Sequence, residues 1–77
     1  MTYNIPMQMG HDGVPHPDYI AIAEDHGARR FNERITDPQV RQCWIDRVLY
    51  LPVAAEKGPE ALAEAIAECN RYAGGRT

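Results

Sequence analysis

Residues 37–51 read DPQVRQCWIDRVLYL and form the most regularly patterned run in the chain. Asp37 can accept a hydrogen bond from a backbone N–H of the first turn, and Pro38 suits the first helical position, where its missing N–H costs nothing. Apolar residues then recur on one helical face at steps of four, four and three, as Val40, Trp44, Val48 and Leu51. The run therefore predicts an amphipathic helix, with the single tryptophan buried at the centre of a small core.

The neighbours of this run set its expected boundaries. Cys43 and Leu49 flank the apolar stripe and are expected to widen it. Pro52 disfavours helical backbone at the residue before it, so the helix is expected to end there, at 38–51. Trp44 could instead be an exposed anchor for a partner protein, but its place in the stripe favours the core.

Two further helices are predicted on either side. Residues 59–73 begin with Pro59 at the first helical position and are followed by a glycine pair that suits a helix end. Their apolar stripe consists of Leu62, Ala65, Ile66, Cys69, Tyr72 and Ala73. Residues 18–34 form the first helix, where Gly27 favours a break or kink because a mid-helix glycine costs roughly 1 kcal/mol.

Residues 1–17 cannot form a long helix, because glycine or proline interrupts them five times. Apolar residues alternate with polar residues or proline in a strand-like pattern, at Tyr3, Ile5, Met7 and Met9. Pro6 and the shortness of the run favour an edge strand or an extended arm, and no second strand is evident. Such an arm packs across its own helices or docks on another chain. The first arrangement is favoured, because a small domain needs every apolar group.

Length and composition limit the fold to one small unit. We predict an all-α domain of three helices over residues 18–77, preceded by an extended arm and turn over residues 1–17. No stretch approaches the ~18 apolar residues of a membrane span. Residues 1–10 have neither a basic start nor a long apolar run, so we expect no signal peptide and a cytoplasmic, reducing location. Cys43 and Cys69 are then free thiols, a disulfide between their helices being the alternative.

The sequence carries no recognisable catalytic motif. Serine is absent, and both cysteines fall on predicted apolar faces, where a lowered pKa is not expected. No glycine loop of the phosphate-binding or dinucleotide-binding type is present. The formal charge of −3 argues against a nucleic-acid partner, which would need a broad basic surface. We therefore expect no enzymatic activity and no cofactor.

Residues 11–18 contain the only cluster of side chains that commonly bind metals. A transition metal could bind His11, Asp12 and His16, with Asp18 nearby. The two histidines do not have the i, i+4 spacing that pairs imidazoles on a helix, and no cysteine lies nearby. The run therefore predicts a turn leading into a helix, and metal binding is kept as an alternative.

Three groups of residues are predicted to contact a partner. Glu60, Glu64 and Glu68 follow one another at i, i+4 and form an acidic ridge on the last helix. This ridge is simply solvated or faces the chain's own arginines, or else it complements a basic surface on a partner. The second group, Arg29, Arg30 and Arg34, surrounds Phe31 and suits phosphate or carboxylate. The third is the flexible pair Met7 and Met9.

The leading functional hypothesis is a small, non-enzymatic interaction factor that binds the surface of a larger protein or complex. Small acidic helical proteins of phages and mobile elements, including inhibitors of host defence nucleases, act in this way, and their size and class suggest the same here. One alternative is a small structural subunit of a larger enzyme. Another is a metal-binding protein that uses the loop from His11 to His16. A homodimer is compatible with each of these.

Overall fold

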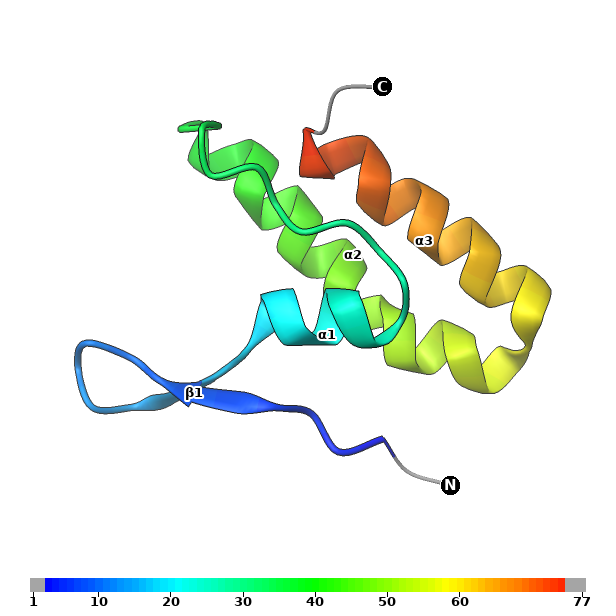
Figure 1. Cartoon of the computed structure of the whole chain (residues 1–77), viewed down its shortest axis with the longest axis horizontal. Coiled ribbons are helices and arrows are strands. Elements are labelled where there is room, and N and C mark those ends of the chain that lie inside the picture. The colour runs from blue at the N-terminus through cyan, green and yellow to red at the C-terminus, as the bar shows by residue number, and fades with distance from the viewer. Residues whose placement is uncertain (1–2, 75–77) are drawn as a thin grey trace.

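The computed structural model describes residues 3–74, in which three helices carry a small hairpin (Figure 1). The elements are β1 (Met7–Met9), β2 (Pro15–Pro17), α1 (Tyr19–Asp25), α2 (Pro38–Lys57) and α3 (Pro59–Ala73). Helices α2 and α3 pack along each other, α1 packs against α2, and the hairpin projects from the helices. Three helices are present, as predicted, and 58% of the described residues are helical. The chain is not all-α, because β1 and β2 form a two-stranded sheet.

Trp44 is the centre of the core, as its position in the stripe predicted. Its side chain is only 1% exposed, and Val48 and Leu51 are fully buried beside it on α2. Its ring lies 5.5 Å from that of Phe31, and its indole N–H donates a hydrogen bond of 3.3 Å to the Arg29 carbonyl oxygen. Trp44 thus joins α2 to the irregular segment that follows α1.

Helix α1 is much shorter than the predicted 18–34. Asp18 caps its start by accepting a hydrogen bond from the Ala21 N–H, at 3.1 Å. The helix stops at Asp25, because Gly27 takes a left-handed conformation with φ of 83°. The segment after Gly27 then runs in extended and turn conformations to Asp37, and the Asn32 N–H donates to the Ala73 carbonyl oxygen at the end of α3. The break or kink expected at Gly27 is therefore the end of α1, and the helix does not resume after it.

Helix α2 is longer than predicted and continues through Pro52. Its start is as expected, since Asp37 accepts a hydrogen bond of 2.9 Å from the Gln39 N–H. The expected end at residue 51 is wrong, because Leu51 and Ala54 are both fully buried and hold the helix across the proline. Burial of apolar groups on both sides outweighs the missing hydrogen bond. Leu49 does not widen the core stripe, since it is 39% exposed.

Gly58 alone joins α2 to α3. It ends α2 by donating its N–H to the Ala54 carbonyl oxygen and adopts φ of 132°, which turns the chain back. Helix α3 buries Ala65, Cys69 and Ala73, all of which belong to the predicted stripe. Within the described residues Cys43 and Cys69 are free thiols, as expected, and no described helix has the length and apolar character needed to cross a membrane.

Replacing the proline inside α2 should stabilise the protein. Pro52→Ala restores a backbone donor in the helix interior, so we expect the free energy of unfolding to rise by about 1–2 kcal/mol. Urea denaturation followed by Trp44 fluorescence measures this change. Pro38→Ala is the matched control at the first helical position, where the change should stay within about 0.5 kcal/mol. Equal effects of the two substitutions would contradict the account of Pro52.

The buried thiol on α3 should make stability fall in alkali. Burial raises the pKa of Cys69 from 9.0 to about 11, and the Trp44 side chain opposes this in part. Because only the unfolded chain ionises readily above pH 9, the stabilisation is complete below that pH and is lost as pH rises toward 11. Between about pH 8 and about pH 10 we expect a loss of about 1 kcal/mol that Cys69→Ala abolishes. Parallel pH profiles for the two proteins would contradict this.

Candidate interaction surface

The hairpin separates its side chains into an apolar face and a polar face. Strands β1 and β2 are antiparallel, with Met7 opposite Pro17, Gln8 opposite His16 and Met9 opposite Pro15. Opposed residues share one face of a sheet, and successive residues alternate between faces. The apolar hairpin face therefore consists of Met7, Met9, Pro15 and Pro17, and we include with it the exposed Ile5, two residues before Met7. Gln8 and His16 lie on the other face.

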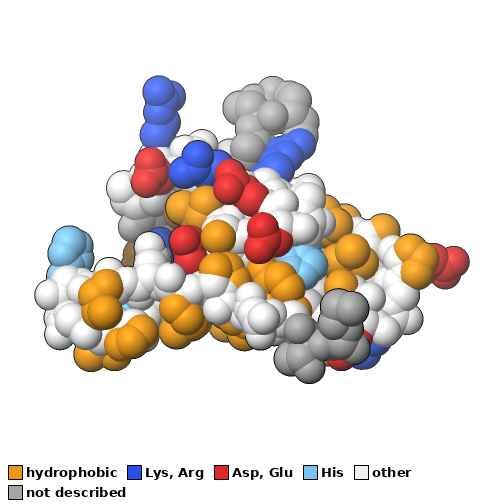
Figure 2. Space-filling view, turned by 60° about the horizontal axis from the view of Figure 1, so that its bottom comes forward, with side chains coloured by type: hydrophobic (Ala, Val, Ile, Leu, Met, Phe, Trp, Pro, Cys, Tyr) orange, Lys and Arg blue, Asp and Glu red, His pale blue; other side chains and the backbone are white. Residues whose placement is uncertain are grey.

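The apolar hairpin face is turned away from the core. Ile5 is 46% exposed, Met7 55% and Met9 69%. The polar face instead contributes Gln8 to a pocket beside Trp44. Figure 2 shows apolar side chains gathered on the projecting hairpin, at the left of that view. Packing of Met7 and Met9 across the chain's own helices, which the sequence favoured, is therefore wrong.

The two edges of the hairpin differ in their hydrogen-bonding capacity. Backbone hydrogen bonds run from Asp18 N–H to the Pro6 carbonyl oxygen and from Gly10 N–H to the Val14 carbonyl oxygen, at 2.8 and 3.0 Å. Hydrogen-bonded and non-hydrogen-bonded pairs alternate along an antiparallel ladder, so the Met7–Pro17 and Met9–Pro15 pairs are not bonded to each other, and their backbone groups point outward. On β2 these residues are Pro15 and Pro17, which have no N–H. On β1 they are Met7 and Met9, so β1 alone offers donors and acceptors to a further strand.

Local interactions hold the hairpin in place. The Tyr3 hydroxyl donates a 2.6 Å hydrogen bond to the Asp25 carboxylate, and its ring meets that of His26 edge-on. Burial, the hydrogen bond and the negative charge of Asp25 raise the pKa of Tyr3 to about 12, so this hydroxyl stays a donor. At the turn, Gly13 has φ of 78° and Asp12 accepts a hydrogen bond from the Val14 N–H.

The predicted metal residues take up turn and capping positions. Asp12 orders the turn, and the His16 Nε2 atom lies 3.5 Å from its carboxylate. His11 is exposed, and Asp18 caps α1. Across residues 3–74, no three His, Cys, Asp or Glu side chains are grouped so that they could hold a metal ion.

The acidic ridge does not behave as one surface. Glu68 lies 3.4 Å from Arg71 and 4.0 Å from Arg47, so the chain's own arginines face it. Glu60 and Glu64 are exposed and form no ion pair with another described residue. Glu64 and Glu68 line a groove of about 480 Å³ between α2 and α3, together with Asp46 and Tyr50 on the opposite wall.

The three predicted arginines lie beside the end of α3 that is remote from Glu60. The Arg29 N–H donates to the Asn70 side-chain oxygen at 2.8 Å, so the backbone of this segment is tied to α3. The Arg30 guanidinium lies 3.9 Å from the Glu24 carboxylate, and Arg34 is exposed. The arginines and the ridge are therefore separate surfaces.

Sequence reasoning missed two parts of the exposed apolar surface. Ile5 alternates in phase with Met7 and Met9 but is missing from the predicted partner contacts. On α2, Leu49 and Val53 are 39% and 48% exposed, at i and i+4, and form a second apolar pair. The assumed helix end at Pro52 hid this pair. Comparison with family models, with curated proteins and with solved structures found no match.

The register of the hairpin predicts a specific pattern of amide exchange. The N–H groups of Gly10 and Asp18 are bonded across the hairpin, whereas those of Met7 and Met9 face solvent. We expect Gly10 and Asp18 to exchange more slowly with deuterium than either methionine, as NMR can measure residue by residue. Protection of the Met7 and Met9 amides in the monomer would show a different register.

Proposed function

We propose that this chain is a small, non-enzymatic interaction factor that docks on a larger protein or complex through its N-terminal hairpin. The observation that supports this most directly is the apolar hairpin face, which points to solvent in a chain of only 77 residues. Small domains are short of buried apolar area, so an uncovered apolar face is a costly feature. Binding of another protein would bury this apolar area and so stabilise the complex.

The chemistry of the face suits an adaptable protein contact. Methionine side chains are flexible and polarizable, so Met7 and Met9 can adjust to the shape of a partner. Ile5 and the two prolines add rigid apolar surface on either side. The open edge of β1 can also pair with an extended segment of the partner, while the prolines of β2 prevent pairing on the opposite edge. The apolar face and the open edge of β1 therefore adjoin each other on the same strand.

The expected partner is a protein, and inhibition of a larger enzyme, such as a phage-directed defence nuclease, is one action that such docking would produce. Occupying a surface needs no catalytic group in the factor itself. The exposed carboxylates of Glu60 and Glu64 would then act at longer range, by favouring approach to a basic surface.

Replacing the two exposed methionines should weaken partner binding without unfolding the chain. The partner is first captured from a lysate of the source cells, identified and purified, and its affinity is then measured by calorimetry. Met7→Gln with Met9→Gln removes apolar area that binding would bury, so we expect the affinity to fall by about tenfold or more. Circular dichroism should show an unchanged helix content, because neither side chain belongs to the core.

The chain provides a matched control for this experiment. Leu49→Gln with Val53→Gln removes two exposed apolar side chains from α2 and should leave the affinity within about twofold. Equal losses in both double variants would contradict docking through the hairpin. A homodimer that dissociates in the methionine variant would show that a second copy covers this face, and would also contradict the proposal.

A further inference from the structure

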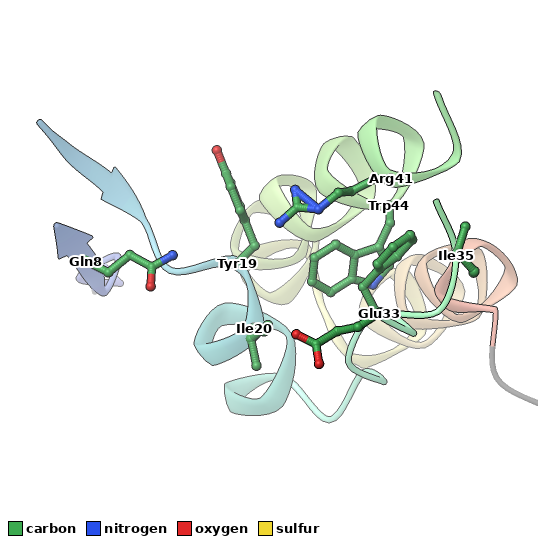
Figure 3. A pocket seen from close by; sticks show the side chains of 8 residues that line it. Gln8, Tyr19, Ile20, Glu33, Ile35, Arg41 and Trp44 are labelled. Atoms are coloured by element: carbon green, nitrogen blue, oxygen red, sulfur yellow. The ribbon is translucent and has the colours of Figure 1, made fainter. Parts of the chain in front are cut away.

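A second candidate site lies where the hairpin, α1 and α2 meet the segment after Gly27. It is a pocket of about 270 Å³, just below the usual range for drug-sized ligands, so it fits a small metabolite. Aromatic rings of Phe31 and Trp44 line it, together with Ile20. Figure 3 shows side chains from all four parts of the chain converging on this opening.

The pocket also holds two opposite charges that do not neutralise each other. The Arg41 guanidinium and the Glu33 carboxylate both line it, and neither forms an ion pair with the other or with another residue between 3 and 74. In Figure 3 they lie on opposite sides of the Trp44 ring. A cation and an anion that line one opening without pairing with each other suit a ligand that bears both charges.

We propose that this pocket binds a small zwitterion, of the chemical class of free α-amino acids with an apolar side chain. Arg41 would receive the carboxylate, because its planar guanidinium matches a carboxylate with two parallel hydrogen bonds. Glu33 would receive the ammonium group. The apolar side chain would lie against Tyr19 and Ile20, which are half-buried at this opening, while the Gln8 amide lies within the same pocket and can donate or accept. This site is separate from the apolar hairpin face, so it stands or falls independently of the proposed function.

Trp44 provides a direct readout, because it is the only tryptophan and lines the pocket. L-leucine, L-methionine and L-phenylalanine are titrated into the full chain while Trp44 fluorescence and heat are recorded. The proposal expects saturable binding by at least one of them. N-acetyl-L-leucine lacks the ammonium group and L-leucinamide lacks the carboxylate, so each should bind about tenfold more weakly than L-leucine or worse.

Two single variants test which residue binds the carboxylate of the ligand and which binds its ammonium group. In Arg41→Gln, L-leucine should lose its advantage over L-leucinamide, whereas its advantage over the N-acetyl form should persist. In Glu33→Gln, L-leucine should lose its advantage over the N-acetyl form, whereas its advantage over L-leucinamide should persist. A general disturbance of the fold would lower all affinities together and would not produce this exchange. Arg34→Gln and Glu60→Gln, which lie outside the pocket, are the charge-matched controls and should bind like the original chain.

Two outcomes would overturn the proposal. One is the lack of any saturable signal with the three amino acids up to about 10 mM, beyond which binding would have little meaning. The other is equal binding of L-leucine and its two derivatives, which would show that neither charge is recognised.

Discussion

The contacts of the Trp44 indole hold together parts of the chain that would otherwise not be fixed. Its ring meets Phe31, and its N–H donates a hydrogen bond to the Arg29 carbonyl oxygen. Helices α2 and α3 could pair without it, but the segment after Gly27 has no regular secondary structure of its own. A large aromatic ring with one polar atom can bury area and still satisfy a backbone carbonyl. This contact therefore positions both the pocket beside Trp44 and α1, to which the hairpin is attached.

The orientation of the hairpin follows from the way it is anchored. Tyr3 ties its first strand to the end of α1, and Asp18 connects its second strand directly to the start of α1. With both ends fixed, the register decides which side chains turn inward, and it turns Gln8 toward the pocket. A shift of one residue would turn the methionines toward the pocket instead. The register therefore places a polar side chain, and not a methionine, at the pocket.

The sequence predicts well those elements that depend on local signals, and poorly those that depend on distant ones. Asp37, Pro38 and the stripe around Trp44 predict most of α2, because capping and periodicity are local. The continuation through Pro52 depends on burial of Leu51 and Ala54 against the rest of the fold, which no local rule contains. Strand β2 is Pro-His-Pro, a composition that strand propensity disfavours, and only pairing with β1 makes it a strand. The sequence did not predict the pocket. Its two charged residues, at positions 33 and 41, belong to different segments, and only the folded chain brings them to the same opening beside Trp44.

The position of the prolines links the shape of the hairpin to its use. A two-stranded ribbon has two edges, and an apolar ribbon with two open edges would associate with any exposed strand. Pro15 and Pro17 occupy those positions of β2 whose N–H groups would face outward, so that edge lacks donors without disturbing the bonds to β1. The same prolines lie on the apolar face and enlarge it. Pro15 and Pro17 therefore have three effects. They remove the hydrogen-bond donors from the outer edge of β2, they leave the β1 edge free to pair, and they enlarge the apolar hairpin face. A hairpin that only filled space in a small domain would need none of these three features, and its methionines would lie inside.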